Sequence, residues 1–139
     1  MNRIMGLVVV LLLSGTSLFA QQELVGKWLT QDKDAVVEIY QKENKFYGRV
    51  VQLMPATQKD GSPFLDVNNP EEHLRNRKIL GMNTILDFEW NGEELENGKL
   101  YDPKSGNHYE GKIWVENNQL RLRGYVGFVF STETWTKQN

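Results

Sequence analysis

Cysteine is absent from this chain of 139 residues, which excludes disulfide bonds, thiolate metal sites and cysteine nucleophiles. Histidine is scarce as well, because His73 and His108 are the only two and lie far apart, without the spacing of metal ligands. Positive charge is not in excess either, since 16 Lys and Arg residues stand against 18 Asp and Glu residues. A protein that binds a phosphate backbone needs a basic surface, so we expect no nucleic-acid partner, no metal and no cofactor.

The usual catalytic motifs are also missing. No serine lies in a Gly-x-Ser-x-Gly elbow, and no glycine-rich phosphate loop is present. The segment 66–70, Asp-Val-Asn-Asn-Pro, is similar to the start of a calcium loop, but Pro70 places no side-chain oxygen at the fifth position. We therefore predict no catalytic residue. An enzyme stays open as a third alternative, because a fold can bring together acid and base groups that are distant in sequence.

A long apolar run occurs only at the N-terminus. Arg3 precedes an unbroken apolar run over 7–13, and a Ser-Gly-Thr-Ser break then leads to Ala20. This is the pattern of a signal peptide, and the run is too short to span the bilayer core as a helix, which takes roughly 20 residues. We predict a signal peptide over 1–20 and a single mature domain over 21–139, exported to the periplasm or secreted and not membrane-spanning. An uncleaved anchor or an N-terminal core strand is the alternative.

Beyond residue 20, short β-type runs alternate with turn residues. In the run 35–42, apolar Val37 and Ile39 alternate with polar neighbours, and Asn91-Gly92 is a strong hairpin signal. About eight such runs follow one another through short turns, and a meander of this kind loses its exposed edges by closing on itself. We predict an all-β fold, a roughly eight-stranded antiparallel up-and-down barrel. The apolar side chains expected to point inward are Phe46, Val50, Leu86, Phe88, Tyr109, Ile113, Leu120, Leu122 and Phe130.

The segment 54–80, after the third strand, departs from this pattern. It is long, polar and rich in turn-forming residues, and Asn69-Pro70 with Glu72 three residues after Asn69 has the form of a capped helix start. We predict one short helix here, from Pro70 to about Arg77. Long ordered insertions between strands often serve as lids or binding loops.

The chain resembles two known groups of proteins. Gly26 and Trp28 at the start of the meander are similar to the opening of a lipocalin (calycin-like) barrel, in which the tryptophan plugs one end and an arginine after the last strand covers it; no such arginine is present here. The whole mature chain more closely resembles a bacterial family of small exported proteins known as domain of unknown function 2147. The motifs that carry this resemblance are Gly26-x-Trp28, Tyr47-Gly48-Arg49, Asn69-Pro70-x4-Arg75, Gly81, Leu100-Tyr101-Asp102-Pro103-x2-Gly106-x2-Tyr109-x-Gly111-Lys112, Arg123-Gly124-Tyr125-x-Gly127 and Thr134-Trp135.

The family resemblance implies a lipocalin-like barrel and brings no established activity and no catalytic residues. We assign structural roles to Gly26, Trp28, Asn69, Pro70, Asp102, Pro103, Gly106 and Gly124. The residues proposed to bind a ligand are Arg49, Arg75, Tyr101, Tyr109 and Arg123. Two interpretations of the arginines stay open: Arg75 pairs with Asp102 to fasten the insertion to the barrel rim, or Arg75 or Arg49 binds the carboxylate of a fatty acid or similar amphiphile.

An eight-stranded barrel can be filled by its own side chains or hold one small ligand. Gly48, Gly111 and Gly124, at inward positions, either hollow out the interior or relieve strand curvature. We predict an exported barrel that binds or carries a small apolar or amphipathic ligand. The alternative is a solid barrel, an envelope or interaction protein with no small-molecule ligand, and a homodimer is left open.

Overall fold

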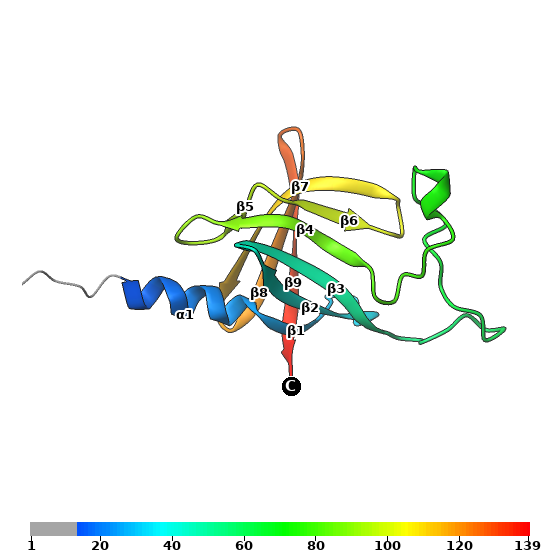
Figure 1. The fold of residues 1–139 in the computed structure, drawn as a ribbon, viewed down its shortest axis with the longest axis horizontal. Coiled ribbons are helices and arrows are strands. Elements are labelled where there is room, and N and C mark those ends of the chain that lie inside the picture. Colours follow the sequence, from blue (N-terminus) through cyan, green and yellow to red (C-terminus); the bar gives the residue numbers. More distant parts are fainter. Residues whose placement is uncertain (1–13) are drawn as a thin grey trace, which may run out of the picture.

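The computed structural model describes residues 14–139 (Figure 1). Most of the predicted signal peptide, residues 1–13, therefore lies outside the described residues. Its last part belongs to helix α1 (Ser14–Leu24), which runs through the predicted cleavage position after Ala20. No helix within residues 14–139 is long and apolar enough to cross a membrane.

After α1, the regular secondary structure consists almost entirely of strands. They are β1 (Gly26–Leu29), β2 (Ala35–Lys42), β3 (Lys45–Leu53), β4 (Asn83–Trp90), β5 (Leu95–Glu96), β6 (Lys99–Asp102), β7 (Asn107–Glu116), β8 (Gln119–Val126) and β9 (Val129–Gln138). Each pairs with its neighbours in antiparallel fashion, and the pairings β3–β4 and β1–β9 close the sheet. β5 and β6 both lie between β4 and β7, so the two short strands share one position. The predicted eight-stranded antiparallel barrel is confirmed.

Most of the predicted inward residues form the core. Phe46, Val50, Phe88, Ile113, Leu120 and Leu122 are all buried, while Leu86 and Tyr109 are only partly covered. The prediction that Phe130 points inward is wrong, because its side chain is 54% exposed. It pairs with Tyr125 across β8 and β9, and that pair lies on the outer face of the barrel. Successive strand residues alternate between faces, so the outward position of Tyr125 follows from its neighbour Gly124.

Helix α1 lies at one end of the barrel, which Trp28 closes. Leu24 and Trp28 are each 1% exposed, and the indole N–H of Trp28 donates to the carbonyl of Leu24 at 2.9 Å. The Lys137 ammonium, on β9, lies 4.6 Å from the centre of the Trp28 ring. A lysine thus covers the plug where the lipocalin pattern has an arginine, and the contact is a cation–π interaction. We call this the closed end.

The opposite end, which we call the mouth, is formed by four connections. These are the loops over 30–34 and 54–82 and the turns over 103–106 and 127–128, which join β1–β2, β3–β4, β6–β7 and β8–β9. The hairpin of β8 and β9 projects well beyond the neighbouring strands (Figure 1). The mouth and the closed end therefore differ in character, since only the closed end carries an internal plug.

The helix predicted from Pro70 to Arg77 is wrong in extent, because a single 3-10 turn, η1 (Glu72–Leu74), is present in the β3–β4 loop. The capping box does not form. The side-chain oxygen of Asn69 accepts instead from the N–H of Glu71, only two residues on, and Arg75 Nε donates to the Asn69 carbonyl. These contacts favour an Asx turn and short i→i+3 bonds over an α-helix. The longer helix of the described chain is α1, before β1 rather than after β3.

Candidate ligand site at the barrel mouth

Two of the inward glycines make room for neighbouring side chains. A Cβ atom at Gly48 would lie 2.7 Å from Ile85 Cδ1, and one at Gly111 would lie 2.7 Å from Leu100 Cδ1. Both positions are therefore occupied by packed side chains, and the interpretation that these glycines hollow out the barrel is not supported. The interior next to the closed end is a core and not a pocket.

Gly124, the cross-strand partner of Gly111, is less crowded. A Cβ atom added there would meet only Tyr109, at an ordinary contact distance of 3.5 Å. Tyr109 also lines an open cavity of about 540 Å³, together with Lys99, His108, Glu110, Tyr125 and Val126. Drug-sized ligands occupy sites of roughly 300–1,000 Å³. The volume is therefore sufficient for a small molecule, although the cavity lies at the rim and is open to solvent.

A second cavity, of about 420 Å³, lies at the closed end, where Gln21 of α1 meets Phe46 and Trp90. Gln21 would be the first residue after the predicted cleavage. The shape of this cavity therefore depends on the helix that cleavage would shorten, and we place the candidate site at the mouth.

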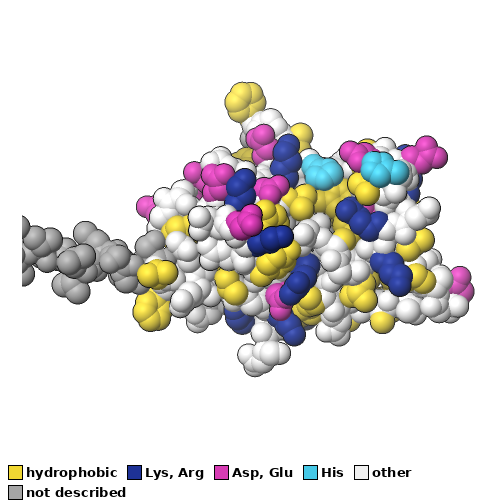
Figure 2. Space-filling model, in the orientation of Figure 1, with side chains coloured by type: hydrophobic (Ala, Val, Ile, Leu, Met, Phe, Trp, Pro, Cys, Tyr) yellow, Lys and Arg dark blue, Asp and Glu magenta, His cyan; other side chains and the backbone are white. Residues whose placement is uncertain are grey.

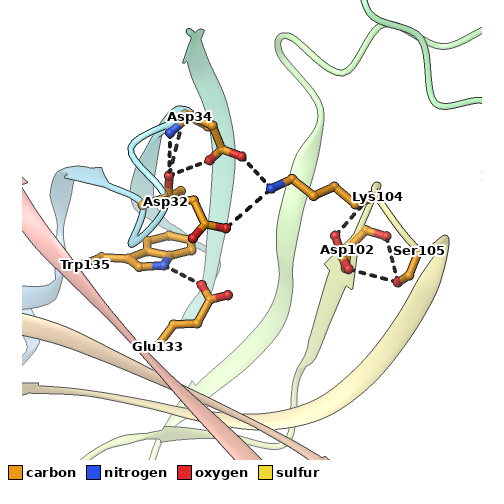
Figure 3. Close-up of polar contacts among 9 residues, drawn as sticks. Asp32, Asp34, Asp102, Lys104, Ser105, Glu133 and Trp135 are labelled. Carbon is orange, nitrogen blue, oxygen red and sulfur yellow. Dashed lines mark hydrogen bonds and ion pairs between the residues drawn. The ribbon is translucent and has the colours of Figure 1, made fainter.

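An ion pair spans the mouth (Figure 3). The ammonium of Lys104, on the β6–β7 turn, lies 2.6 Å from a carboxylate oxygen of Asp34 and 3.5 Å from one of Asp32. Both aspartates belong to the β1–β2 loop, on the opposite side of the barrel. Burial opposes ionisation of Asp34, but hydrogen bonds from Lys104 and Thr30 outweigh it and lower its pKa; the hydrogen bond with Asp34 likewise raises the pKa of Lys104. Lys104 thus forms a clasp between two connections that the barrel strands hold apart.

Asp102 does not pair with Arg75, so that interpretation is wrong. Its carboxylate accepts from the Lys104 N–H at 3.0 Å and the Ser105 hydroxyl at 2.9 Å, and it shapes the β6–β7 turn (Figure 3). Further along the rim, the Trp135 indole N–H donates to Glu133 at 2.9 Å.

The five proposed ligand residues are not brought together. Arg49, on the outer face of β3, donates to Glu38 from Nε at 3.0 Å and lies over the Tyr40 ring. Arg75 donates a hydrogen bond to the Asn69 carbonyl, and Arg123 lies on the outer face of β8. Of the five, only Tyr109 lines the rim cavity. The position of Arg49 follows from strand alternation, because its neighbour Gly48 points inward.

Tyr101 is buried and takes part in a polar cluster that fixes the β3–β4 loop. Its hydroxyl donates to Asp66 at 2.5 Å, and Asp66 also accepts from Asn69 Nδ2 at 2.9 Å and from Arg77 at 2.7 Å. Burial, followed by the hydrogen bond to Asp66, raises the pKa of Tyr101 to about 12. Asp66 is 0% exposed. Nothing in its polar sequence neighbourhood distinguishes a buried carboxylate from a solvated one.

The same loop is also held to the β6–β7 turn, through the Asn68 side chain. The side-chain amide of Asn68 donates to the carbonyls of Pro103 and Lys104, at 3.3 and 2.9 Å. Gly106 faces the Asn68 carbonyl so closely that an added Cβ would lie 1.8 Å from its oxygen. The Asn69-Pro70 and Tyr101-Asp102-Pro103-x2-Gly106 motifs therefore meet in space, and together they anchor the insertion beside the mouth.

Comparison with known proteins supports the family and the fold. The family model described as "Uncharacterized protein conserved in bacteria (DUF2147)" matches residues 26–137. Comparison with curated proteins gives no match. The chain is similar to a solved structure titled "Protein HP1028 from the human pathogen Helicobacter pylori belongs to the lipocalin family", with a TM-score of 0.74 and 25% sequence identity over 84% of this chain and 83% of that one. The lipocalin-like barrel, its motif residues and the family match agree, and the chain belongs to the bacterial family DUF2147.

Proposed function

We propose that this protein is an exported binding module that holds a small amphipathic molecule at the mouth of its barrel. The lipocalin-like fold suggests ligand binding in general. The observation that carries the finer proposal is the rim cavity of about 540 Å³ beside Tyr109. It lies on the outer side of β6, β7 and β8 near the mouth, and not in the interior, which Ile85 and Leu100 fill. A ligand would accordingly sit in the rim and not deep in the barrel.

The lining of the rim cavity favours a molecule with a flat apolar part and a polar head. Tyr109 and Tyr125 offer aromatic faces, while Lys99 and His108 offer hydrogen-bond donors. Neither Arg49 nor Arg75 lines the cavity. In this proposal Lys99, and not an arginine, binds the carboxylate of the ligand. A carboxylate or sulfonate head is therefore matched to Lys99.

The test uses anilinonaphthalene sulfonate, an anionic aromatic probe, titrated by fluorescence. Tyr125→Ala removes one aromatic face, and an aromatic contact contributes about 0.5–1.5 kcal/mol to binding. The dissociation constant of the probe should therefore rise roughly 2- to 10-fold. The matched control is Tyr47→Ala. The Tyr47 and Tyr40 ring centres are 5.7 Å apart, and those of Tyr125 and Phe130 are 6.0 Å apart, so the two tyrosines have similar aromatic neighbours. Tyr47, however, lies on β3 and does not line the cavity. Lys99→Gln should weaken binding while leaving every apolar side chain in place.

Equal binding by all three variants and the parent protein would contradict the rim site and favour the solid-barrel alternative. Native mass spectrometry of protein purified from the cell envelope adds a probe-free measurement, because a co-purifying small molecule adds a discrete mass to the barrel. If the proposed export and cleavage take place, the mass of the protein in the same spectrum should equal that of a chain that begins at Gln21.

A further inference from the structure

The two most exposed large apolar side chains of the described chain, Phe128 and Val129, lie with two others at the end of the β8–β9 hairpin. Val126, Phe128, Val129 and Phe130 are 65%, 105%, 73% and 54% exposed. Figure 2 shows a hydrophobic side chain at the far end of this projecting hairpin. We call residues 126–130 the hairpin tip. An apolar group of this size at a projecting point costs solubility and marks an interaction site.

The charges around the hairpin tip are arranged in a particular way. The stretch 124–132 holds no charged residue, and Arg123 directly precedes it. The Arg123 guanidinium lies 4.3 Å from the Phe130 ring centre and 5.1 Å from that of Trp114, and Nε donates to the Thr132 hydroxyl at 2.9 Å. Among the described residues it forms no ion pair. The apolar hairpin tip therefore has behind it, on the barrel side, a cationic Arg123 that forms no ion pair with a described carboxylate.

From these observations we infer that the hairpin tip inserts into the surface of a phospholipid bilayer, with Arg123 meeting lipid phosphate. A strand rises about 3.3 Å per residue, so Arg123 lies roughly 13 Å behind the turn at Gly127. Apolar side chains of interfacial elements reach about 5–10 Å below the headgroup boundary. Insertion of the tip to that depth brings the guanidinium to the headgroups, where phosphate oxygens accept its hydrogen bonds.

A second copy of the chain fits the tip less well. The four side chains expose on the order of 500 Å², whereas a stable dimer buries about 800 Å² on each partner. A projecting tip also lacks the flat flanks that would supply the difference, and a bilayer requires none. Because the rim cavity includes Val126 and Gly127, docking would bring its opening to the lipid surface. The inference holds whether or not that cavity is occupied.

The test is vesicle co-sedimentation of the full chain as the cell processes it, with phosphatidylcholine vesicles and with vesicles that also contain phosphatidylglycerol. Val129→Ser should lower the vesicle partition constant, obtained from the bound fraction over a range of lipid concentrations, about tenfold, from the loss of one buried valine. Val25→Ser is the matched control, because Val25 is 40% exposed at the closed end and should leave binding unchanged. Arg123→Gln should weaken binding to both kinds of vesicle, since both carry phosphate.

The absence of cysteine permits a second measurement. Phe128→Cys and Val25→Cys can each carry one environment-sensitive fluorophore, and only the label at 128 should shift to the blue with vesicles. Near-ultraviolet circular dichroism establishes that each variant is folded. The inference is overturned if the parent chain does not bind vesicles, if the two serine variants bind equally, or if sedimentation without lipid shows a dimer that Val129→Ser dissociates.

Discussion

Asp66 shows how much one side chain contributes to this structure. It is a fully buried carboxylate that accepts hydrogen bonds from Tyr101, Asn69 and Arg77. Burial alone would raise its pKa, but the three donors outweigh burial and hold the pKa below the usual 3.8. The carboxylate is therefore a stabilising group only in its charged form. It joins the β3–β4 loop to β6, two segments that are distant in the sequence.

Replacement of Asp66 by Asn should destabilise the protein by about 1–3 kcal/mol, because three donors lose a charged acceptor. The unfolded carboxyl titrates near 3.9 and the folded one at lower pH. The stabilisation is therefore complete above about pH 3.9 and is lost as the pH falls through the folded pKa. Urea unfolding of the parent protein and of Asp66→Asn, from neutral to acidic pH, measures this loss. The difference between their free energies of unfolding should become smaller in acid. Val67→Asn, at an exposed neighbour, serves as the control; a constant difference across pH would contradict the assignment.

The hydroxyl of Tyr101 provides an independent reading of the same cluster. Its pKa of about 12 arises first from burial and then from the hydrogen bond to Asp66. The neutral phenol is favoured in the folded state, so its stabilisation is present below pH 10 and lost as the pH rises through about 12. Ultraviolet titration should show a tyrosine that ionises near pH 12 and is absent in Tyr101→Phe. Asp66→Asn should lower that pKa only in part, since burial remains.

At the scale of elements, alternation and turn chemistry predicted the barrel well. The period of two placed Val37, Ile39 and Ile113 inside, and the same rule applied to Gly48 puts Arg49 outside, which the ligand hypothesis overlooked. The β3–β4 loop was less predictable because its conformation depends on contacts made across the mouth. The Asn69 side chain had several local partners available, and the choice between them follows from Asp66, whose burial only the tertiary fold determines.

The contact between the β3–β4 loop and the β6–β7 turn can be tested with a pair of glycines. Gly106 has φ +74° and faces the Asn68 carbonyl, whereas Gly61 has φ +84° and nothing within 4 Å of an added Cβ. Gly61→Ala should cost only the backbone strain of about 1–2 kcal/mol. Gly106→Ala should cost clearly more and should release the loop, measured as faster amide exchange at Asp66 and Asn69. Equal losses of stability in the two variants would show that the Asn68 contact contributes nothing.

At the scale of the whole molecule, the two ends of the barrel differ in structure. Trp28, Leu24 and Lys137 close one end with an apolar plug, and the core above it is continuous. The other end carries the Lys104 clasp, the rim cavity and the hairpin tip. With no cysteine in the chain, the plug and the strand pairing stabilise the fold without disulfide bonds. The apolar plug therefore lies at the closed end, and the proposed binding sites lie at the mouth.

This division predicts how the N-terminal helix contributes. Leu24 is 1% exposed and its carbonyl binds Trp28, whereas Leu18 and Phe19 of the same helix are 58% and 72% exposed. Leu24→Ala should destabilise the protein by about 2–5 kcal/mol through the cavity it leaves under the plug. Leu18→Ala and a chain that begins at Gln21 should unfold at the same denaturant concentration as the full chain, because the Leu18 and Phe19 side chains that cleavage removes are exposed and the plug is kept. A loss of stability in the chain from Gln21 that matches the loss in Leu24→Ala would show that all of α1 belongs to the mature fold, and it would contradict the proposed signal peptide.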